Sequence, residues 1–338
     1  MRIYGDIYWQ GKIVKGTIEI VDGIINDFEE GKKEYDMKGN VISSFINAHT
    51  HIGDYFIKRV PKGTIPEIVG PGGFKHQKLK ETSENQIKEG MKQAIEIMKK
   101  EGISHFADFR EGGINGLKML YEINPQINSI KLGRPKGYEY DAEEIRTILD
   151  NGDGIGLSSI SDYPLDVIEK IAKDVKRKNK IFGLHASENI REDFDFILDL
   201  KPTFLVHMLT ATDSDLEKMA EEKIPLVITP RSNAFFSRTP NIPKLLKIGI
   251  KISLGTDNGM LVKPSISEEM IYAYKISNMK EKVHPQEILK MSIENPRKIF
   301  KIEDNKIGEK ASLIVLKEGV DIASLTVKFI YNDIVRVC

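Results

Sequence analysis

The sequence is poor in three features that would assign a chain of this size to a class at once. It has one cysteine, Cys338, so it can form no internal disulfide, and neither a thiolate metal site nor a catalytic thiol is expected. Lys plus Arg and Asp plus Glu both number 50, and this balance argues against nucleic acid polymers and anionic membranes as partners. No apolar run approaches the roughly 18 residues that a membrane span needs, and the charged start does not resemble a signal peptide. We therefore expect a cytoplasmic protein in which histidine and carboxylate side chains hold any metal.

Both ends of the chain show the pattern of short antiparallel strands. Between residues 1 and 40, apolar and polar positions alternate in stretches that are broken by Gly11, Gly16 and Gly23. Residues 307–338 have the same character, including an expected strand from Thr326 onward. The sequence therefore predicts a small β-sandwich domain that is assembled from residues 1–40 and 307–338.

Between these ends, short apolar runs alternate with amphipathic helical stretches. Ser83 and Gln86 predict a capping box before a helix that ends at Lys100, and Asp141 and Asp213 are expected to cap two further helices. The predicted strands begin near Val41, Ile103, Asn128, Gly154, Ile181, Thr203, Pro225 and Lys251. After the first strand they recur about every 25 residues, which suits one strand and one helix per unit.

Eight such units predict an α/β fold, with a (β/α)₈ TIM barrel over residues 41–306. An open, doubly wound sheet is the alternative fold. That fold usually carries a glycine-rich phosphate loop after its first strand, whereas residues 47–51 here read NAHTH. The barrel is therefore favoured.

Four of the seven histidines and one aspartate follow the apolar runs of predicted strands. The first strand leads to His49 and His51, which point to the same face of an extended chain. The fifth strand ends in His185, the sixth in His207 and the eighth in Asp257. One histidine after an apolar run is usually a core side chain, but the carboxyl ends of barrel strands meet at one mouth. Together these residues predict a metal site.

Several motifs are similar to those of the amidohydrolase superfamily, and most closely to those of its deaminase and chlorohydrolase branch. Residues 47–51 resemble the first-strand signature, residues 185–188 (HASE) the H-x-x-E motif, and residues 254–258 (LGTDN) the G-T-D strand. Residues 229–233 (TPRSN) resemble C-P-x-S-N with threonine in place of cysteine, and residues 307–313 resemble a shortened tail motif. The resemblance covers nearly the whole chain.

This resemblance implies a hydrolase of non-peptide carbon–nitrogen bonds that binds one divalent metal. The implied ligands are His49, His51, His185 and Asp257, and His207 is implied to lie close to the metal-bound water. Three imidazoles and a carboxylate suit Zn²⁺, with Fe²⁺ as the alternative. Binuclear members carry a bridging lysine, usually from the fourth strand, but residues 154–159 contain no Lys or Glu. A mononuclear site is therefore expected.

The expected reaction is hydrolytic deamination of a cyclic amidine in a small nucleobase-like or nucleoside-like substrate. Asp257 and His207 would accept the water proton, and Glu188 would protonate the ring nitrogen, which requires a raised pKa of its carboxyl group. Glu188 is alternatively an acid that is favoured at a helix N-terminus. An amide or lactam hydrolase and a catalytically silent binding barrel are the alternative functions.

Arg110, Arg134, Arg231 and Asn233 are the candidate substrate-binding residues. Arg110 and Arg134 follow the second and third strands and could clamp a carboxylate or a phosphate group of the substrate. Structural pairing, for example of Arg110 with Asp108 or Glu111, is the alternative for these arginines.

The segment from residue 55 to residue 80 is too long for an ordinary strand-to-helix connection and resembles a loop that covers the substrate. We expect His76 within it to be exposed, and we assign His105 and His284 structural roles. The neutral surface and the habits of the family favour a homo-oligomer.

Overall fold

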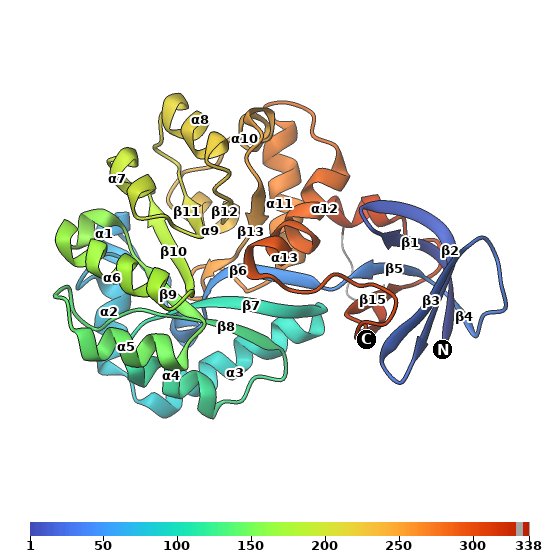
Figure 1. Cartoon of the computed structure of the whole chain (residues 1–338), viewed down its shortest axis with the longest axis horizontal. Helices are drawn as coiled ribbons and strands as arrows, with labels where there is room; N and C mark the ends of the chain where they lie inside the picture. The colour runs from blue at the N-terminus through green and yellow to red at the C-terminus, as the bar shows by residue number, and fades with distance from the viewer. Residues whose placement is uncertain (329–333, 338) are drawn as a thin grey trace.

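The computed structural model describes residues 1–328 and 334–337, which form two β-sheets (Figure 1). The larger sheet comes from the middle of the chain and is surrounded by helices. The smaller sheet combines both ends of the chain and lies to one side of the helical layer. None of the described helices is long and apolar enough to cross a membrane.

The larger sheet contains nine parallel strands in the order β13-β12-β11-β10-β9-β8-β7-β6-β14. Their bounds are β6 (Phe45–His51), β7 (Ile103–Arg110), β8 (Asn128–Gly133), β9 (Gly154–Leu157), β10 (Ile181–Ala186), β11 (Phe204–His207), β12 (Leu226–Ile228), β13 (Ile252–Leu254) and β14 (Asp257–Asn258). Only Gly255 and Thr256 separate β13 from β14, and these two strands pair with β12 and β6 respectively. The sheet therefore curls until its two ends meet, which gives an α/β fold with a TIM-like barrel.

Seven of the eight predicted strand starts lie within one residue of the start of an observed barrel strand, but the first does not. Val41 lies in β5 (Asn40–Ser43) of the smaller sheet, and the barrel strand begins at Phe45. Between them, the N–H of Ser44 donates to the carbonyl of Ser312 at 2.8 Å, and its hydroxyl donates to Ser104 Oγ at 2.7 Å. The chain changes sheets at Ser44, between the apolar pairs Val41-Ile42 and Phe45-Ile46, although the sequence pattern predicts one strand across these residues.

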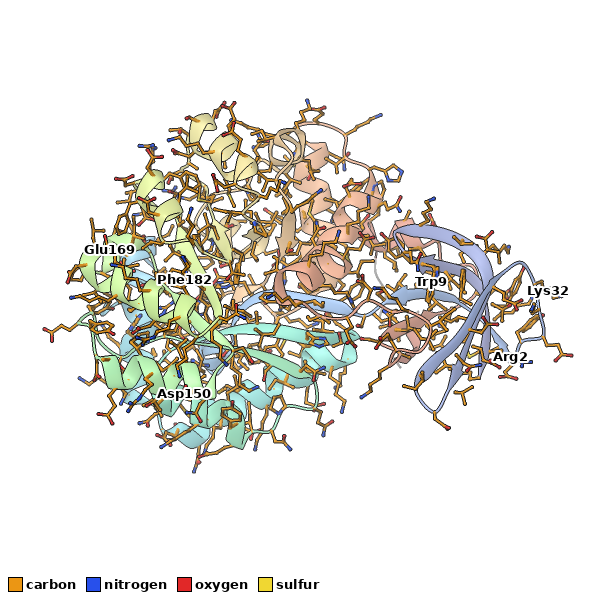
Figure 2. The ribbon with its side chains drawn as sticks, viewed as in Figure 1. Arg2, Trp9, Lys32, Asp150, Glu169 and Phe182 are labelled. Atoms are coloured by element: carbon orange, nitrogen blue, oxygen red, sulfur yellow. The ribbon has the colours of Figure 1, made fainter. Side chains whose placement is uncertain are left out.

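Thirteen α-helices are formed by the described residues, and most of them cover the outside of the barrel. Their bounds are α1 (Ile65–Ile68), α2 (Phe74–Glu81), α3 (Glu84–Lys100), α4 (Gly113–Glu122), α5 (Ala142–Asn151), α6 (Leu165–Arg177), α7 (Phe194–Asp199), α8 (Asp213–Glu221), α9 (Pro230–Phe235), α10 (Ile242–Ile248), α11 (Ile266–Asn278), α12 (Pro285–Ile293) and α13 (Asn295–Phe300). Three short 3₁₀ helices are η1 (Ile52–Asp54), η2 (Ile160–Asp162) and η3 (Ile322–Thr326). In Figure 2, Asp150 of α5 and Glu169 of α6 lie on the outside of this layer, whereas Phe182 of β10 is enclosed by it.

The helix caps follow the sequence at two of the three predicted positions. The Ser83 hydroxyl accepts the N–H of Gln86 at the start of α3, and Asp141 caps α5. At α8 the cap is Thr212 and not Asp213. The Thr212 hydroxyl accepts the N–H of Asp215, and the Asp215 carboxylate accepts the N–H of Thr212 in return. This reciprocal pair satisfies two backbone donors of the helix start, so it fixes the start one residue earlier.

The smaller sheet has the order β16-β15-β5-β1-β2-β3, with β4 beside β1. Its remaining bounds are β1 (Arg2–Trp9), β2 (Lys12–Val21), β3 (Ile24–Glu30), β4 (Met37–Lys38), β15 (Leu313–Leu316) and β16 (Ile334–Val337). The two chain ends meet because β5 pairs with β1 on one side and with β15 on the other. Trp9, which is labelled in Figure 2, stacks on Phe28 with the two ring centroids 4.7 Å apart, and this pair packs against the apolar core of the smaller sheet.

The expected sandwich takes the form of one curled sheet. Backbone hydrogen bonds join Gly23 to Ala311 and Ile25 to residues 308 and 309, so the edge strand β3 folds over onto the segment before β15. The strand expected from Thr326 is replaced there by the end of η3, and residues 329–333 and Cys338 lie outside the described residues. That the terminal segments 1–40 and 307–338 form a domain separate from residues 41–306 remains a prediction.

Candidate metal centre

Four side-chain atoms converge at the carboxyl ends of the barrel strands. Nε2 of His49 lies 3.2 Å from Nε2 of His185 and 3.3 Å from Oδ1 of Asp257. Nε2 of His51 lies 3.4 Å from each of the same two atoms. All four side chains are buried. The strands β6, β10 and β14 thus bring the four predicted ligands to one point.

These distances match the spacing of ligand atoms around a metal ion. A tetrahedral ion with bonds of about 2.0–2.1 Å holds its ligand atoms about 3.3–3.4 Å apart. Nδ1 of His51 faces the carbonyl of Phe109 and Nδ1 of His185 faces that of Leu157, so each Nδ1 carries the ring proton. The Nε2 lone pairs of both rings therefore point to the shared centre. Lone pairs so close together require a cation between them, and the residues fit a divalent metal.

The protonation states of the histidines agree with metal binding. Burial lowers the pKa of His51 to about 3, and it lowers the pKa of His185 well below its ordinary value. Both rings are therefore neutral at neutral pH, which is the form that binds metals.

Two neighbours that the sequence did not predict hold the ligands in place. Nδ1 of His51 lies 2.7 Å from Oε1 of Glu111, and the Ser232 hydroxyl donates to Oδ2 of Asp257 at 2.7 Å. Carboxylates behind ligating histidines fix the ring orientation and raise its basicity. In the sequence, only the position of Glu111 directly after strand β7 indicated that its side chain could lie near the ligands.

His207 lies at the edge of this cluster. Its potential ligand atom and those of His49, His185 and Asp257 all lie within 4.8 Å of one another, so His207 is also within reach of a shared ion. The contacts of 3.4 Å from Nε2 of His51 to His185 and Asp257 support His51 as the fourth ligand. The Thr229 hydroxyl donates to Oδ1 of the Asn233 side chain. Nδ2 of the same side chain lies 3.2 Å from Nδ1 of His207 and donates to it. Nε2 of His207 therefore carries the ring proton.

The backbone at two strand ends adopts a left-handed conformation. His207 has a φ of 79° and Asp257 a φ of 62°, so the chain turns sharply where each strand meets the centre. Between β13 and β14, a Cβ on Gly255 would lie 2.6 Å from the Cβ of His49. Glycine at this position lets the eighth strand approach the first closely enough for Asp257 to join the histidines.

A cavity of about 250 Å³ opens beside the cluster. Its wall includes His51, His185, His207, Asp257, Glu188, Arg134, Ser158, Ser159, Ser161 and Asp162. The segment 55–80 contributes Ile65, Pro66, Val69 and Lys75, so it lines the cavity, although it contains α1 and α2 and is not an open loop. His76 lies in α2 and is half-buried, contrary to its predicted exposure, and burial lowers its pKa to about 4.

Glu188 faces the same cavity. Its Oε2 lies 3.6 Å from Nε2 of His207, and its side chain is largely buried. Burial raises the pKa of Glu188. A carboxyl group with a raised pKa is able to hold a proton near neutral pH.

Of the four predicted substrate-binding residues, only Arg134 lines the cavity. Its side chain is 8% exposed, its Nε donates to the carbonyl of Gly156, and no ion pair among the described residues involves it. Arg110 is buried away from the cavity, where it pairs with Glu111 at 2.8 Å and Asp108 at 3.4 Å. Structural pairing, the alternative given above, therefore describes Arg110.

Arg231 and Asn233 also have structural partners. Arg231 pairs with Glu269 at 2.8 Å and with Glu268, so its charge is already compensated by carboxylates of α11. Asn233 is buried against His207. His284 caps α12, and His105 in β7 contacts Ser104 and Asn128, as expected of structural histidines.

The sequence profile of the Amidohydrolase family matches residues 40–336. The chain belongs to this family. A putative aminohydrolase of Archaeoglobus fulgidus is 36% identical to this amidohydrolase over 248 residues, which cover 73% of the chain and 72% of the relative.

Solved structures resemble this amidohydrolase in fold. The Helicobacter pylori aminofutalosine deaminase, solved with methylthio-coformycin, has a TM-score of 0.80 at 15% identity and covers 99% of this chain and 98% of its own. An adenosine deaminase from Xanthomonas campestris, solved with bound zinc, has a TM-score of 0.78 at 12% identity over 100% of this chain and 91% of its own. The amidohydrolase is thus a hydrolase with the fold of metal-dependent deaminases.

Proposed function

We propose that this amidohydrolase deaminates a cyclic amidine in a nucleobase-like or nucleoside-like small molecule. The observation that carries the proposal is Glu188, whose carboxyl group has a pKa raised by burial and faces the cavity beside His207. Hydrolysis of an ordinary amide needs no proton donor to a ring nitrogen at that place. The deaminases among the structural neighbours support the same class of reaction.

The ligand set would hold one divalent ion, with Zn²⁺ preferred and Fe²⁺ as the alternative. When bound, such an ion lowers the pKa of a water molecule from 15.7 to roughly 7. The ligands are His49, His51, His185 and Asp257. The zinc in the Xanthomonas neighbour supports the preference for Zn²⁺.

The protein side chains would handle the protons. Protonated Glu188 donates to the ring nitrogen beside the carbon that bears the amino group, which makes that carbon electrophilic. Asp257 accepts the proton of the attacking water, whose oxygen bonds to the carbon, and passes it to the amino group, which leaves as ammonia when the carbon–nitrogen bond breaks. The remaining hydroxyl proton returns to Glu188 as the carbonyl of the product forms. Because Asn233 donates to Nδ1 of His207, the N–H at Nε2 of His207 orients the water as a donor. This differs from the expectation that His207 would accept the proton.

Arg134 would bind the substrate. Its guanidinium lies in the cavity wall and forms no ion pair with a carboxylate of the described residues, so it can donate to an oxygen, a ring nitrogen or an anionic group of the substrate. Arg110, Arg231 and Asn233 are not included in this proposal, because their donors are engaged with protein groups.

The test is an ammonia-release screen on protein reconstituted with Zn²⁺ or Fe²⁺. The panel contains aminopurines, pterins, cytosines and aminotriazines, each beside a lactam or amide of similar size. Ammonia release from an aminoheterocycle is expected. Hydrolysis of the amides or lactams without any ammonia release from the aminoheterocycles would replace the proposal with the amide-hydrolase alternative.

The variant Glu188→Gln tests the role of the carboxyl group. Loss of a general acid lowers turnover by about 10²–10⁴-fold, and we expect a decrease in this range. Zinc content, measured on the same preparation, should equal that of the wild type, because Glu188 is not among the ligands. Turnover retained in this variant would refute the proton-transfer role.

A further inference from the structure

Helix α2 of the covering segment buries a single side chain completely, and that side chain is a lysine. Lys75 is 2% exposed, whereas the apolar Phe74 and Leu79 of the same helix are only half-buried. A surface helix normally buries an apolar stripe against the core. Here a cation takes that place, which calls for specific partners.

Both partners of Lys75 lie beside metal ligands. Its Nζ donates to Oε1 of Glu111 at 2.8 Å and to Oδ1 of Asn258 at 3.2 Å. The same Glu111 oxygen accepts from Nδ1 of His51, and Asn258 directly follows Asp257. One ammonium group therefore connects the covering segment to β7 and β14 at the mouth of the barrel.

The Lys75–Glu111 contact is an ion pair. Nζ of Lys75 and Oε1 of Glu111 lie 2.8 Å apart, and both side chains are buried. The carboxylate does not depend on Lys75 alone, because Arg110 donates to its other oxygen at 2.8 Å. Glu111 can therefore keep orienting His51 without the lysine.

The two halves of the covering segment are held in different ways. Ile68 of α1 is buried in a small apolar cluster with Ile57 and Met260. Helix α2 has no fully buried apolar residue: Phe74 packs against the same cluster and Leu79 against the barrel core, but both are only half-buried, so Lys75 is its one fully buried anchor. Because Lys75 of α2 lines the cavity, as do Gly70 and Pro71 just before this helix, movement of α2 would open the space beside the metal ligands.

We propose that Lys75 is a positioning residue that keeps the covering segment closed over the metal centre, through Glu111 and Asn258, without holding the metal itself. Loss of a hydrogen-bonded charge pair should increase the population of open conformations, in which α2 has moved away from the barrel, by a factor of about ten or more. Metal affinity should remain close to that of the wild type, since His51 and Glu111 keep their other contacts.

The experiment compares Lys75→Met, which has a side chain of similar length, with Lys78→Met on the same helix. Lys78 pairs with Glu81 on the surface and serves as the matched control. Hydrogen–deuterium exchange is measured on peptides that cover residues 55–80, and zinc affinity is measured by competition with a chelator. We expect roughly tenfold faster exchange in α2 of Lys75→Met only, with zinc affinity within about threefold of the wild type.

Glu111→Gln provides the contrast, because removal of the carboxylate behind a ligating histidine typically weakens metal affinity by about 10–100-fold. Wild-type exchange rates in Lys75→Met would overturn the proposal, since other contacts would then hold α2. A loss of zinc affinity as large as that of Glu111→Gln would also overturn it, because Lys75 would then belong to the metal site.

A double variant covers the case in which Lys75→Met fails to fold because Glu111 is left with an excess buried charge. Lys75→Met combined with Glu111→Gln removes both charges, and α2 should exchange faster in it than in Glu111→Gln alone. Equal exchange in these two proteins would contradict the role of Lys75. None of these measurements needs a substrate, so they stand or fall independently of the proposed reaction.

Discussion

At the scale of single residues, the proposed chemistry depends on the proton of Glu188. Because burial raises the pKa of this carboxyl group, the protonated form persists to higher pH than for an exposed glutamate. The reaction needs this protonated form, so kcat/KM should fall as pH rises through the pKa of Glu188. The measurement is the pH profile of kcat/KM for any substrate that releases ammonia. A profile that stays flat up to high pH would contradict the assignment.

Arg134 gives a second prediction at this scale. Arg134→Met removes the uncompensated donor from the cavity wall, and hydrogen bonds to charged groups contribute about 1.5–3 kcal/mol. We therefore expect KM to rise by about 10–100-fold, with little change in zinc affinity. Arg231→Met is the control, because Arg231 pairs with Glu268 and Glu269 outside the cavity wall. It should lower the unfolding temperature instead, and an unchanged KM in Arg134→Met would remove Arg134 from the binding site.

The structure brings together those predicted site residues whose positions the backbone alone determines. His49, His185 and Asp257 come together because each follows an apolar run, and the ends of barrel strands must meet. Arg110 and Arg134 stand at equivalent points of the pattern, yet only Arg134 lines the cavity. The difference lies in the carboxylates that each arginine reaches, which depends on side-chain packing that no spacing encodes. Lys75 was missed for the same reason.

At the scale of elements, the contact between α9 and α11 supports the site. Helix α9 carries Ser232, which holds Asp257, and Asn233, which holds His207. Arg231 of α9 pairs with Glu269 of α11, and Glu269 is fully buried. These contacts fix α9, which follows the seventh barrel strand β12, relative to α11, which follows the eighth strand.

Burial raises the pKa of Glu269 from 4.5 to about 7, even though Arg231 opposes this shift. The folded state binds this proton more tightly than the unfolded state. The stabilisation that protonated Glu269 adds to the free energy of unfolding is therefore complete below pH 4.5 and is lost as pH rises to about 7. The difference in unfolding free energy between wild type and Glu269→Gln should change by up to about 3 kcal/mol across this range. Urea unfolding at several pH values measures it, and a constant difference would contradict the raised pKa.

Elements were predicted well where they are long and periodic. The barrel strands from Ile103 onward and the helix that ends at Lys100 follow directly from apolar spacing. The change of sheet at Ser44 was missed, because two serines between the apolar pairs Val41-Ile42 and Phe45-Ile46 also fit the interior of a single strand. The short helices α1 and α2 were hidden among the glycines and prolines of the covering segment, where packing against the barrel overrides local preference.

At the scale of the whole molecule, metal binding should stabilise the fold. An ion that binds only the folded state adds about 4 kcal/mol when its free concentration is 1,000 times the dissociation constant. Removal of the metal with a chelator should therefore lower the unfolding temperature, and added Zn²⁺ should restore it. His185→Ala should show no response to added Zn²⁺. Equal unfolding temperatures with and without metal in the wild type would argue against the site.

Arg297 connects the barrel to the terminal sheet. Its buried guanidinium donates to the carbonyls of Ser44 and Ile293 and to the Ser44 hydroxyl, at the point where the chain passes between the two sheets. Arg297→Ala removes these hydrogen bonds, and a buried acceptor that loses its partner costs about 1–3 kcal/mol. We expect a lower unfolding temperature with unchanged zinc affinity, because the metal ligands lie elsewhere. Loss of zinc affinity in a folded variant would contradict this separation.

The left-handed backbone at His207 and Asp257 limits how this centre can be redesigned. Histidine, aspartate and asparagine tolerate that conformation better than most residues, whereas it costs other side chains roughly 1–2 kcal/mol. Exchanging Asp257 for glutamate, in order to change the preferred metal, would carry this conformational cost in addition to any mismatch in coordination, and a replacement of His207 beside the ligands would carry it too. Efforts to engineer a new metal preference should therefore begin at His49, His51 and His185, where the backbone imposes no such restriction.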